Sequence, residues 1–403
     1  MEDSINDQTP IPIPSFPEFG HSMRQHYLLN EKYNNLNHGS YGCTPEYVIK
    51  ARDNCIQQFE SKPDFFLNYI HPKLYLENRK AIAKLIDVEP EDIVFVKNAT
   101  EASACILHSL NYLPNDIILM FDFVYGAVKS LCNKLADKYQ LQLVIMETNR
   151  EILSSKEKII QLVKDAISQY GKKIRVGIVD FITSTPALLL PIEEIISIFR
   201  ENDIFCMIDG AHAFNHIEFS LKKLDPDFFY TNLHKWGLVP KSLAVLYVKK
   251  NLQHLIHHAI QLAGFKKGLT EEFIQPGSRD LSNIYSLKES MVFLEKIGRK
   301  RMMEYCQELA IKVGKRISEI WNTELLVPQE NKLFMVNVVF PYQGKDISEK
   351  IKWKEYFEEG KTFLAITLYK GVYYARFSCY IYNQLSDYET IAFEILENLK
   401  NSK

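Results

Sequence analysis

The sequence lacks any framework of cysteines. Its seven cysteines lie scattered through 403 residues, and no two of them form a C-x-x-C pair. Scattered thiols are typical of a reducing compartment, and this spacing supports neither a disulfide scaffold nor a zinc site, so we expect no metal. The chain also has no excess of basic residues, since its formal net charge is -2. A surface that binds nucleic acid is normally basic, so nucleic acid is not an expected partner.

Long hydrophobic runs are missing as well. No stretch of about 18 apolar residues occurs, which argues against a membrane-spanning helix. The segment before residue 18 is largely polar, includes Ile11-Pro12-Ile13-Pro14, and has neither the basic flank nor the apolar core of a signal peptide. We expect a flexible tail over residues 1–20 and a cytoplasmic protein.

The chain does contain a regular alternation of apolar and amphipathic segments. Hydrophobic residues make up 46% of it and charged residues 24%, as in a globular protein large enough for more than one domain. Helical patterns are clearest over residues 151–170 and 191–200. Short apolar runs typical of buried strands occupy residues 92–97, 117–121, 141–146, 176–181, 204–208 and 243–248. Strands that alternate with helices predict an α/β fold with a mostly parallel, doubly wound sheet.

The pattern changes after about residue 280. A long helical pattern covers residues 286–320, and strand candidates follow at 332–340 and 373–378. These segments predict a second, smaller α+β domain. We therefore expect a large domain over residues 51–285, a small C-terminal domain over 286–403, and, after the tail, a segment over 21–50 that packs near the active site.

Two segments in the middle of the chain carry the strongest functional signal. The apolar run 204–208 ends at the carboxylate of Asp209, and the segment 232–236 contains the dyad His234-Lys235. A lysine is usually a surface residue, but a buried lysine has a depressed pKa and becomes nucleophilic. An enzyme that uses pyridoxal 5'-phosphate needs such a lysine for a Schiff base, and a carboxylate that keeps the pyridine nitrogen protonated. The pair predicts this cofactor.

Other polar residues follow predicted strands, where ligands bind in open α/β sheets. Thr100 lies in Asn98-Ala99-Thr100-Glu101 at the start of a predicted helix, where its hydroxyl and backbone N–H groups can meet a phosphate; a plain helix cap is the alternative. Tyr125 can stack on the cofactor ring or simply cap the core. His212 can orient Asp209, cover the cofactor ring or serve a structural role.

These motifs resemble those of the class V aminotransferase family, which has the fold type I architecture of pyridoxal phosphate enzymes. The resemblance is carried by Asp209-Gly210-Ala211-His212 and by Asn232 to Trp236, and it runs from Leu36 to Asn383. It is closest to the branch that includes isopenicillin N epimerase-like proteins and hercynylcysteine sulfoxide lyases. The resemblance implies a homodimer that acts on a small amino-acid substrate.

The resemblance also implies a role for each matching residue around the cofactor. Lys235 would form the Schiff base, Asp209 would pair with the pyridinium and His212 would lie near the ring. Tyr125 would stack on the ring. The residues expected at the phosphate are Ala99, Thr100, Asn232, His234 and, reaching the neighbouring subunit, Ser278 in Gly277-Ser278-Arg279-Asp280.

Three further matches concern the substrate. Arg376 matches the arginine that grips the substrate α-carboxylate, for which its two-pronged guanidinium is suited. The alternative for Arg376 is a structural salt bridge. Asn37 and His38 match a segment that lines the substrate pocket, with an ordinary turn as the alternative.

Several reactions share a first step in which Lys235 removes the substrate Cα proton. A cysteine desulfurase would also need a cysteine on the loop before Arg376, and residues 341–362 contain none. We therefore favour a C–S lyase acting on a cysteine conjugate, such as hercynylcysteine sulfoxide in ergothioneine biosynthesis, with the Tyr125 phenol protonating the leaving sulfenate. A transaminase, an isopenicillin N epimerase-like racemase and a catalytically silent scaffold are the alternatives.

Overall fold

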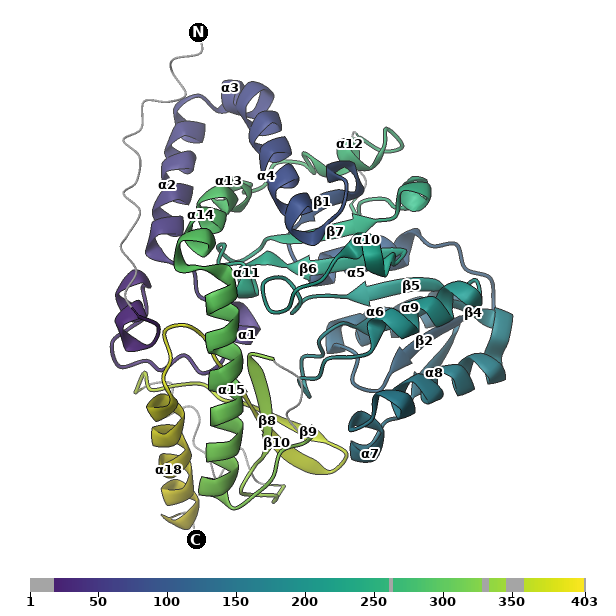
Figure 1. Ribbon diagram of the computed structural model, residues 1–403. Coiled ribbons are helices and arrows are strands. Elements are labelled where there is room, and N and C mark those ends of the chain that lie inside the picture. Colours follow the sequence, from purple (N-terminus) through teal and green to yellow (C-terminus); the bar gives the residue numbers. More distant parts are fainter. Residues whose placement is uncertain (1–17, 261–263, 328–332, 346–358, 402–403) are drawn as a thin grey trace.

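The chain folds around two β-sheets of different size (Figure 1). The computed structural model describes residues 18–260, 264–327, 333–345 and 359–401. The expected tail over residues 1–20 lies outside these ranges except for its last three residues. In the described part of the chain, no helix is both long enough and apolar enough to cross a membrane.

The larger sheet has seven strands in the order β1-β7-β6-β5-β4-β2-β3. They are β1 (Ile93–Val96), β2 (Ile117–Phe121), β3 (Gln142–Met146), β4 (Ile174–Asp180), β5 (Phe205–Asp209), β6 (Phe228–Asn232) and β7 (Ala244–Val248). β7 pairs antiparallel with β1 and β6, and all other pairings are parallel. The expected α/β fold is thus confirmed. The apolar pattern did not single out β6, because Thr231 and Asn232 end it with polar side chains.

Helices cover both faces of this sheet. One face packs against α4 (His71–Ile86), α8 (Lys156–Tyr170) and α9 (Ile192–Glu201), and the other against α5 (Ala99–Ser109) and α6 (Gly126–Tyr139). Successive strand residues point to opposite faces, so Leu119 of β2 lies in the first core and Met120 in the second. Strands buried on both faces must be apolar throughout, which explains their continuous apolar runs.

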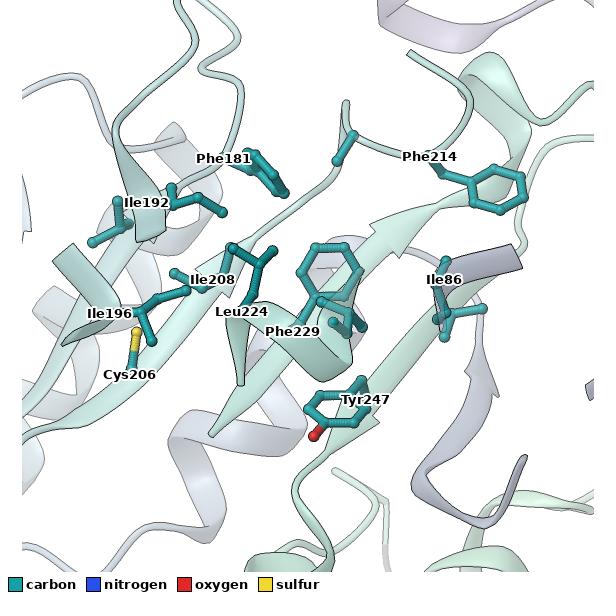
Figure 2. Packing of buried hydrophobic residues seen from close by; sticks show 14 of the residues in the cluster. Ile86, Phe181, Ile192, Ile196, Cys206, Ile208, Phe214, Leu224, Phe229 and Tyr247 are labelled. Atoms are coloured by element: carbon teal, nitrogen blue, oxygen red, sulfur yellow. The ribbon is translucent and has the colours of Figure 1, made fainter. Parts of the chain in front are cut away.

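Figure 2 shows part of the first core, where Ile192 and Ile196 of α9 lie beside Cys206 and Ile208 of β5. Other helices connect these layers or cover their edges, and apart from α2 they are short. They are α1 (His38–Tyr41), α2 (Glu46–Ser61), α3 (Pro63–Phe65), α7 (Arg150–Leu153), α10 (Leu221–Leu224), α11 (Leu233–Trp236), α12 (Leu269–Phe273) and α13 (Ser282–Tyr285), with 3-10 or π turns η1 (His21–His26), η2 (Phe66–Ile70), η3 (Pro90–Asp92), η4 (Gly171–Lys173) and η5 (Lys250–Leu255).

The smaller sheet is antiparallel, in the order β8 (Met335–Val339), β10 (Val372–Ser378) and β9 (Ala365–Tyr369). The long helices α15 (Arg299–Trp321) and α18 (Leu385–Asn401) lie side by side and share a hydrophobic core with it (Figure 1). The strand expected over residues 332–340 corresponds to β8, and residue 332 lies outside the described residues. β9 and α18 were not expected.

Two expected helices are each divided into two. The pattern over residues 151–170 forms α7 and α8, because the Ser155 side chain caps a new helix by accepting a hydrogen bond from the Lys158 N–H at 3.2 Å. The pattern over 286–320 forms α14 (Leu287–Ile297) and α15, because Gly298 between them has a φ of +80°. The apolar periodicity continues across both breaks and therefore conceals them.

The N-terminal segment packs against the small sheet. The Asn34 N–H donates to the Lys361 carbonyl at 2.7 Å, and the Ser378 N–H donates to the Leu36 carbonyl at 2.9 Å. We propose domain limits of 21–50 for this segment, 51–285 for the large domain and 286–403 for the small domain.

A β-hairpin of the small sheet reaches the carboxyl end of β2. At its tip, the Lys370 ammonium lies 2.7 Å from an oxygen of Asp122 and also pairs with Glu147. The Tyr369 hydroxyl lies 2.6 Å from Thr148 Oγ1, which donates in turn to Asp122 at 2.6 Å. Because Thr148 uses its proton on Asp122, Tyr369 must be the donor. The hairpin therefore fastens the small sheet to the loop that follows β2.

The hairpin contact predicts a specific loss of stability. Tyr369→Phe removes one half-buried hydrogen bond, and we expect the free energy of unfolding in urea to fall by about 1 kcal/mol. Tyr373→Phe is the matched control, because the Tyr373 hydroxyl has no hydrogen-bond partner among the described residues. Equal effects of the two substitutions would contradict this account of the contact.

Candidate active site

Asp209 ends β5 at the carboxyl edge of the large sheet, and its side chain is buried. The Ala211 N–H donates to Oδ1 at 2.9 Å, and the Tyr230 hydroxyl donates to Oδ2 at 3.1 Å. Burial raises the pKa of Asp209, while these two hydrogen bonds and the charge of Lys235 oppose the rise. The carboxylate is thus oriented by two donors and enclosed in an apolar core.

Asp180 is a second buried carboxylate beside the first. It ends β4 as the register partner of Asp209, and its Oδ2 has no hydrogen-bond partner among the described residues. Burial, together with the neighbouring charge of Asp209, raises its pKa well above the usual range. Two buried carboxylates side by side are costly unless a cation balances them.

Lys235 lies in α11, directly after β6. Its Nζ is 2.9 Å from Nε2 of His212. Burial and the charge of Arg376 lower the pKa of Lys235 to about 7, although Asp209 and Asp180 oppose this shift. The amine is therefore substantially uncharged near neutral pH, which makes it a nucleophile and a base.

His212 holds this amine in place. Burial lowers its pKa well below the usual range, so the ring is neutral and carries one proton. The indole N–H of Trp236 donates to Nδ1 at 3.4 Å, which places the ring proton on Nε2. That proton points at Lys235 Nζ, and only an uncharged amine can accept it. His212 thus contacts the lysine, and no hydrogen bond to Asp209 is among its contacts.

The N-terminal segment contacts α11, the short helix that contains Lys235. His38 Nε2 lies 2.9 Å from the Lys235 carbonyl oxygen, and Nδ1 lies 2.7 Å from the Tyr382 hydroxyl. Burial lowers the pKa of His38 to about 3, and its ring is fully enclosed. Gly42 has a φ of +68°, and a Cβ there would lie 1.9 Å from the His234 carbonyl oxygen. Both ring nitrogens of His38 are thus engaged within the protein, and its place in the lining of the substrate pocket stays a prediction.

Arg376 projects from β10 and is held by neutral groups. Nη1 donates to the carbonyl oxygen and the hydroxyl of Ser184, each at 3.0 Å. Nη2 donates to Asn37 Oδ1 at 2.7 Å and to Ser40 Oγ at 2.8 Å, while Nε has no partner. Burial lowers the pKa of Arg376 to about 10. No carboxylate in the described part of the chain pairs with it, so Arg376 is a buried positive charge without a counterion.

The start of α5 is fastened to the end of β6. The Ala99 N–H donates to Asn232 Oδ1 at 3.0 Å, and Asn98 caps the helix by accepting from the Glu101 N–H at 2.8 Å. Asn232 therefore contacts Ala99 directly. The Thr100 N–H and hydroxyl donate to no group among the described residues and remain available to an anion at a helix N-terminus.

The three remaining residues expected at the site are His234, which is largely buried, and Tyr125 and Ser278, which are exposed. His234 Nδ1 lies 3.1 Å from the Leu243 carbonyl, and burial lowers the pKa of His234 to about 4. Tyr125 precedes α6 with about half of its side chain exposed. Ser278 is exposed. The structure brings neither Tyr125 nor Ser278 into hydrogen-bonding contact with the group around Lys235.

Several residues of this group were not expected. Asp180 carries the same sequence signal as Asp209, a carboxylate at the end of an apolar run, but the predicted strand 176–181 ran past it. Ser40, Ser184, Trp236 and Tyr230 have no local signal, because their partners lie far away in the chain. The described residues contain no group of three histidine, cysteine, aspartate or glutamate side chains that could hold a metal ion.

The sheet order, the small second sheet and the lysine that follows β6 define a fold type I pyridoxal phosphate enzyme. The chain belongs to the class V aminotransferase family, whose model matches residues 47–390. The fold is also that of the cystine C-S lyase C-DES, solved with its product cysteine persulfide. The TM-score is 0.77 at 15% identity, and the match covers 91% of this chain and 98% of that one.

Several relatives match nearly the whole sequence. The chain is 31% identical over 387 residues to hercynylcysteine sulfoxide lyase of Schizosaccharomyces pombe, a match that covers 93% of this chain and 96% of the relative. It is 28% identical over 401 residues to L-cysteine desulfhydrase of Arabidopsis thaliana, covering 91% of this chain and 88% of the relative. The chain is thus a class V enzyme related to C–S lyases and cysteine desulfhydrases.

The lowered pKa of Lys235 predicts how its reactivity depends on pH. In the cofactor-free protein, we expect reductive methylation of Lys235 to rise with pH through about 7, as the amine loses its proton. Lys300, a lysine on the surface of α15, serves as an internal control. Peptide mass spectrometry measures both residues in one sample.

The same measurement on Arg376→Gln tests the cause of the shift. The charge of Arg376 lowers the pKa of Lys235, so its removal is expected to move the Lys235 profile to higher pH and leave the Lys300 profile in place. Parallel profiles for Lys235 and Lys300 in the wild-type protein would contradict the assignment.

Proposed function

We propose that this class V enzyme is a C–S lyase that removes the sulfur substituent of a cysteine conjugate by β-elimination. The observation that carries the proposal is the pair of buried groups Lys235 and Arg376: burial, and after it the charge of Arg376, lowers the pKa of the Lys235 amine to about 7. A base and an anion-binding group thus share one site. Support comes from the two relatives, of which one is named as a lyase of a cysteine sulfoxide and the other as a desulfhydrase of cysteine.

Pyridoxal 5'-phosphate fits the electrostatics of this site. Asp180 Oδ2 is buried without a partner among the described residues. The basic group whose charge acts on Asp180 and Asp209 is Lys235, and with a pKa of about 7 it is only partly protonated at neutral pH. A protonated pyridine nitrogen at Asp209 would supply the missing positive charge. When bound, the cofactor withdraws electrons from the substrate Cα, which eases loss of the proton there. The residues proposed to hold it are Asp209, Lys235, His212, Tyr125, Ala99, Thr100, Asn232, His234 and, across a homodimer interface, Ser278.

The protein's own groups would then act in sequence. Arg376 binds the substrate α-carboxylate through its guanidinium, and Asn37 fixes the orientation of that guanidinium. Lys235 Nζ takes the Cα proton, and His212 keeps the amine uncharged until it does so. The Tyr125 hydroxyl gives a proton to the leaving sulfur. His38 serves as a positioning residue, because it holds the carbonyl group of Lys235.

The overall reaction balances without an oxidant or reductant. The Cβ–S bond breaks with its electron pair on sulfur, and the Cα–H bond supplies the electrons of the new double bond. Water then converts the three-carbon product to pyruvate and ammonia. A sulfide substrate releases a thiol and a sulfoxide releases a sulfenic acid. We propose hercynylcysteine sulfoxide as the conjugate, in a cytoplasmic step of ergothioneine biosynthesis, and L-cysteine as the second candidate.

The first test measures pyruvate from the purified, cofactor-loaded enzyme incubated with cysteine conjugates. We expect pyruvate and the free sulfur product in equal amounts. Lys235→Ala is expected to abolish both turnover and the visible absorbance band of the bound cofactor. Exchange of the Cα proton without pyruvate would identify an epimerase, and a keto acid that retains its sulfur would identify a transaminase. A colourless protein that takes up no cofactor would leave only the scaffold alternative.

The second test concerns Tyr125. Tyr125→Phe keeps the aromatic ring and removes the proton donor, so we expect kcat for a cysteine sulfoxide to fall by about 100-fold with little change in KM. Tyr69→Phe is the control, because Tyr69 is also exposed but lies on a different element. An unchanged kcat would show that another group protonates the leaving sulfur.

A further inference from the structure

The guanidinium of Arg376 has one donor that nothing in the described part of the chain uses. Its Nη1 donates to the carbonyl oxygen and the hydroxyl of Ser184, and its Nη2 donates to Asn37 Oδ1 and Ser40 Oγ. The Nε–H has no partner among the described residues, although Arg376 is only 3% exposed. Because buried polar groups are normally hydrogen-bonded, this unused N–H indicates an acceptor that a ligand supplies.

The position of the unused donor decides how a carboxylate can bind. A carboxylate binds a guanidinium most strongly through two parallel N–H···O bonds from neighbouring nitrogens. By the standard naming of these atoms, the Nε–H and Nη2 lie on one edge of the group, whereas Nη1 lies on the side of Cδ. A carboxylate with one oxygen at Nε therefore needs Nη2 for the other, and Nη2 already donates to Asn37 and Ser40.

Of these two acceptors, Ser40 is the easier to displace. Asn37 is 6% exposed, whereas Ser40 is partly exposed, and rotation about its Cα–Cβ bond alone moves the hydroxyl. Ser40 also lines a cavity of about 1060 Å³, which leaves its hydroxyl room to turn away from Arg376. An ionised carboxylate attracts the guanidinium more strongly than a neutral hydroxyl does, so the exchange is favourable.

We propose that Ser40 is a displaceable acceptor at the carboxylate-binding arginine. The substrate carboxylate takes the Nε–H with one oxygen, and with the other it replaces the Ser40 hydroxyl at Nη2. Asn37 keeps its hydrogen bond to Nη2 and continues to orient the guanidinium. The inference rests on the proposed function, because it starts from Arg376 as the residue that binds the substrate carboxylate.

Ser40 has a use before the substrate binds. Its hydroxyl accepts from Nη2 and donates to Asn37 Oδ1 at 2.8 Å, so a neutral group satisfies the buried guanidinium at the place of the second carboxylate oxygen. Every carboxylate must then compete with this hydroxyl. Ser40 therefore lowers the affinity of the site for its substrate.

Isothermal titration calorimetry with a ligand that cannot react tests the inference on the full-length, cofactor-loaded enzyme. 3-(Methylthio)propanoic acid has a carboxylate and a sulfur atom but no amine. We expect Ser40→Ala to bind this acid about fivefold more tightly than the wild-type enzyme, because one competing hydrogen bond is removed. Damage to the fold would weaken binding, so it cannot account for a gain in affinity.

Ser184→Ala is the matched control, because it removes a hydroxyl from the same guanidinium but on the Nη1 side. We expect no gain in affinity from this substitution. The neutral 3-(methylthio)propanamide has a single acceptor oxygen, so we expect Ser40→Ala to bind it no more tightly than the wild-type enzyme does. Arg376→Gln is expected to abolish binding of the acid.

The outcomes separate this inference from the proposed function. If Ser40→Ala binds the acid no more tightly than the wild-type enzyme, while Arg376→Gln loses binding, the inference is overturned and the C–S lyase proposal stands. An equal gain in Ser184→Ala would also overturn it, because the edge of the guanidinium would then be irrelevant. If no conjugate yields pyruvate, the proposed function fails, and the calorimetry still decides whether Ser40 competes with a carboxylate at Arg376.

Discussion

Asp180 and Asp209, which end neighbouring parallel strands, are buried, and the groups around them must supply hydrogen bonds or positive charge to these two carboxyl groups. Asp180 and Asp209 are register partners, and burial raises the pKa of both. Hydrogen bonds from Ala211 and Tyr230 orient Asp209, but no described group reaches Asp180 Oδ2. A buried carboxyl group without a partner keeps its proton rather than carry an uncompensated charge, which is the physical meaning of the raised pKa of Asp180. The cationic ring of the proposed cofactor would favour the charged form of Asp209 beside it.

Burial, which raises the pKa of the two aspartates, lowers the pKa of basic side chains. Burial lowers the pKa of Lys235 and His212, so the amine and the imidazole face each other uncharged. Arg376 retains its charge because guanidinium is too basic to lose it, even with its pKa lowered to about 10. One apolar environment thus yields an uncharged base beside a permanent cation, and the difference arises from the intrinsic basicity of the two side chains.

The sequence predicted those parts whose cause is local. Asp209 and Lys235 were recognisable because a carboxylate ends an apolar run and the dyad His234-Lys235 follows it within the next segment. Other parts depend on distant contacts. Arg376 is held by Asn37, Ser40 and Ser184, which lie more than 190 residues away, so no spacing in the chain connects them. The break at Gly298 was concealed because a glycine with positive φ interrupts a helix without interrupting its apolar periodicity.

The hydrogen bonds between Arg376 and the N-terminal residues Asn37 and Ser40 form only after β10 has been synthesised. Asn37 and His38 contact Arg376 and Tyr382 across 339 and 344 residues of sequence, respectively. During synthesis the N-terminal segment therefore emerges long before strand β10, which carries Arg376. The large sheet can form in the meantime from its own consecutive units. The surroundings of Arg376 are thus completed late in biogenesis, and a chain cut short before β10 keeps Lys235 but lacks Arg376, the residue proposed to bind the substrate carboxylate.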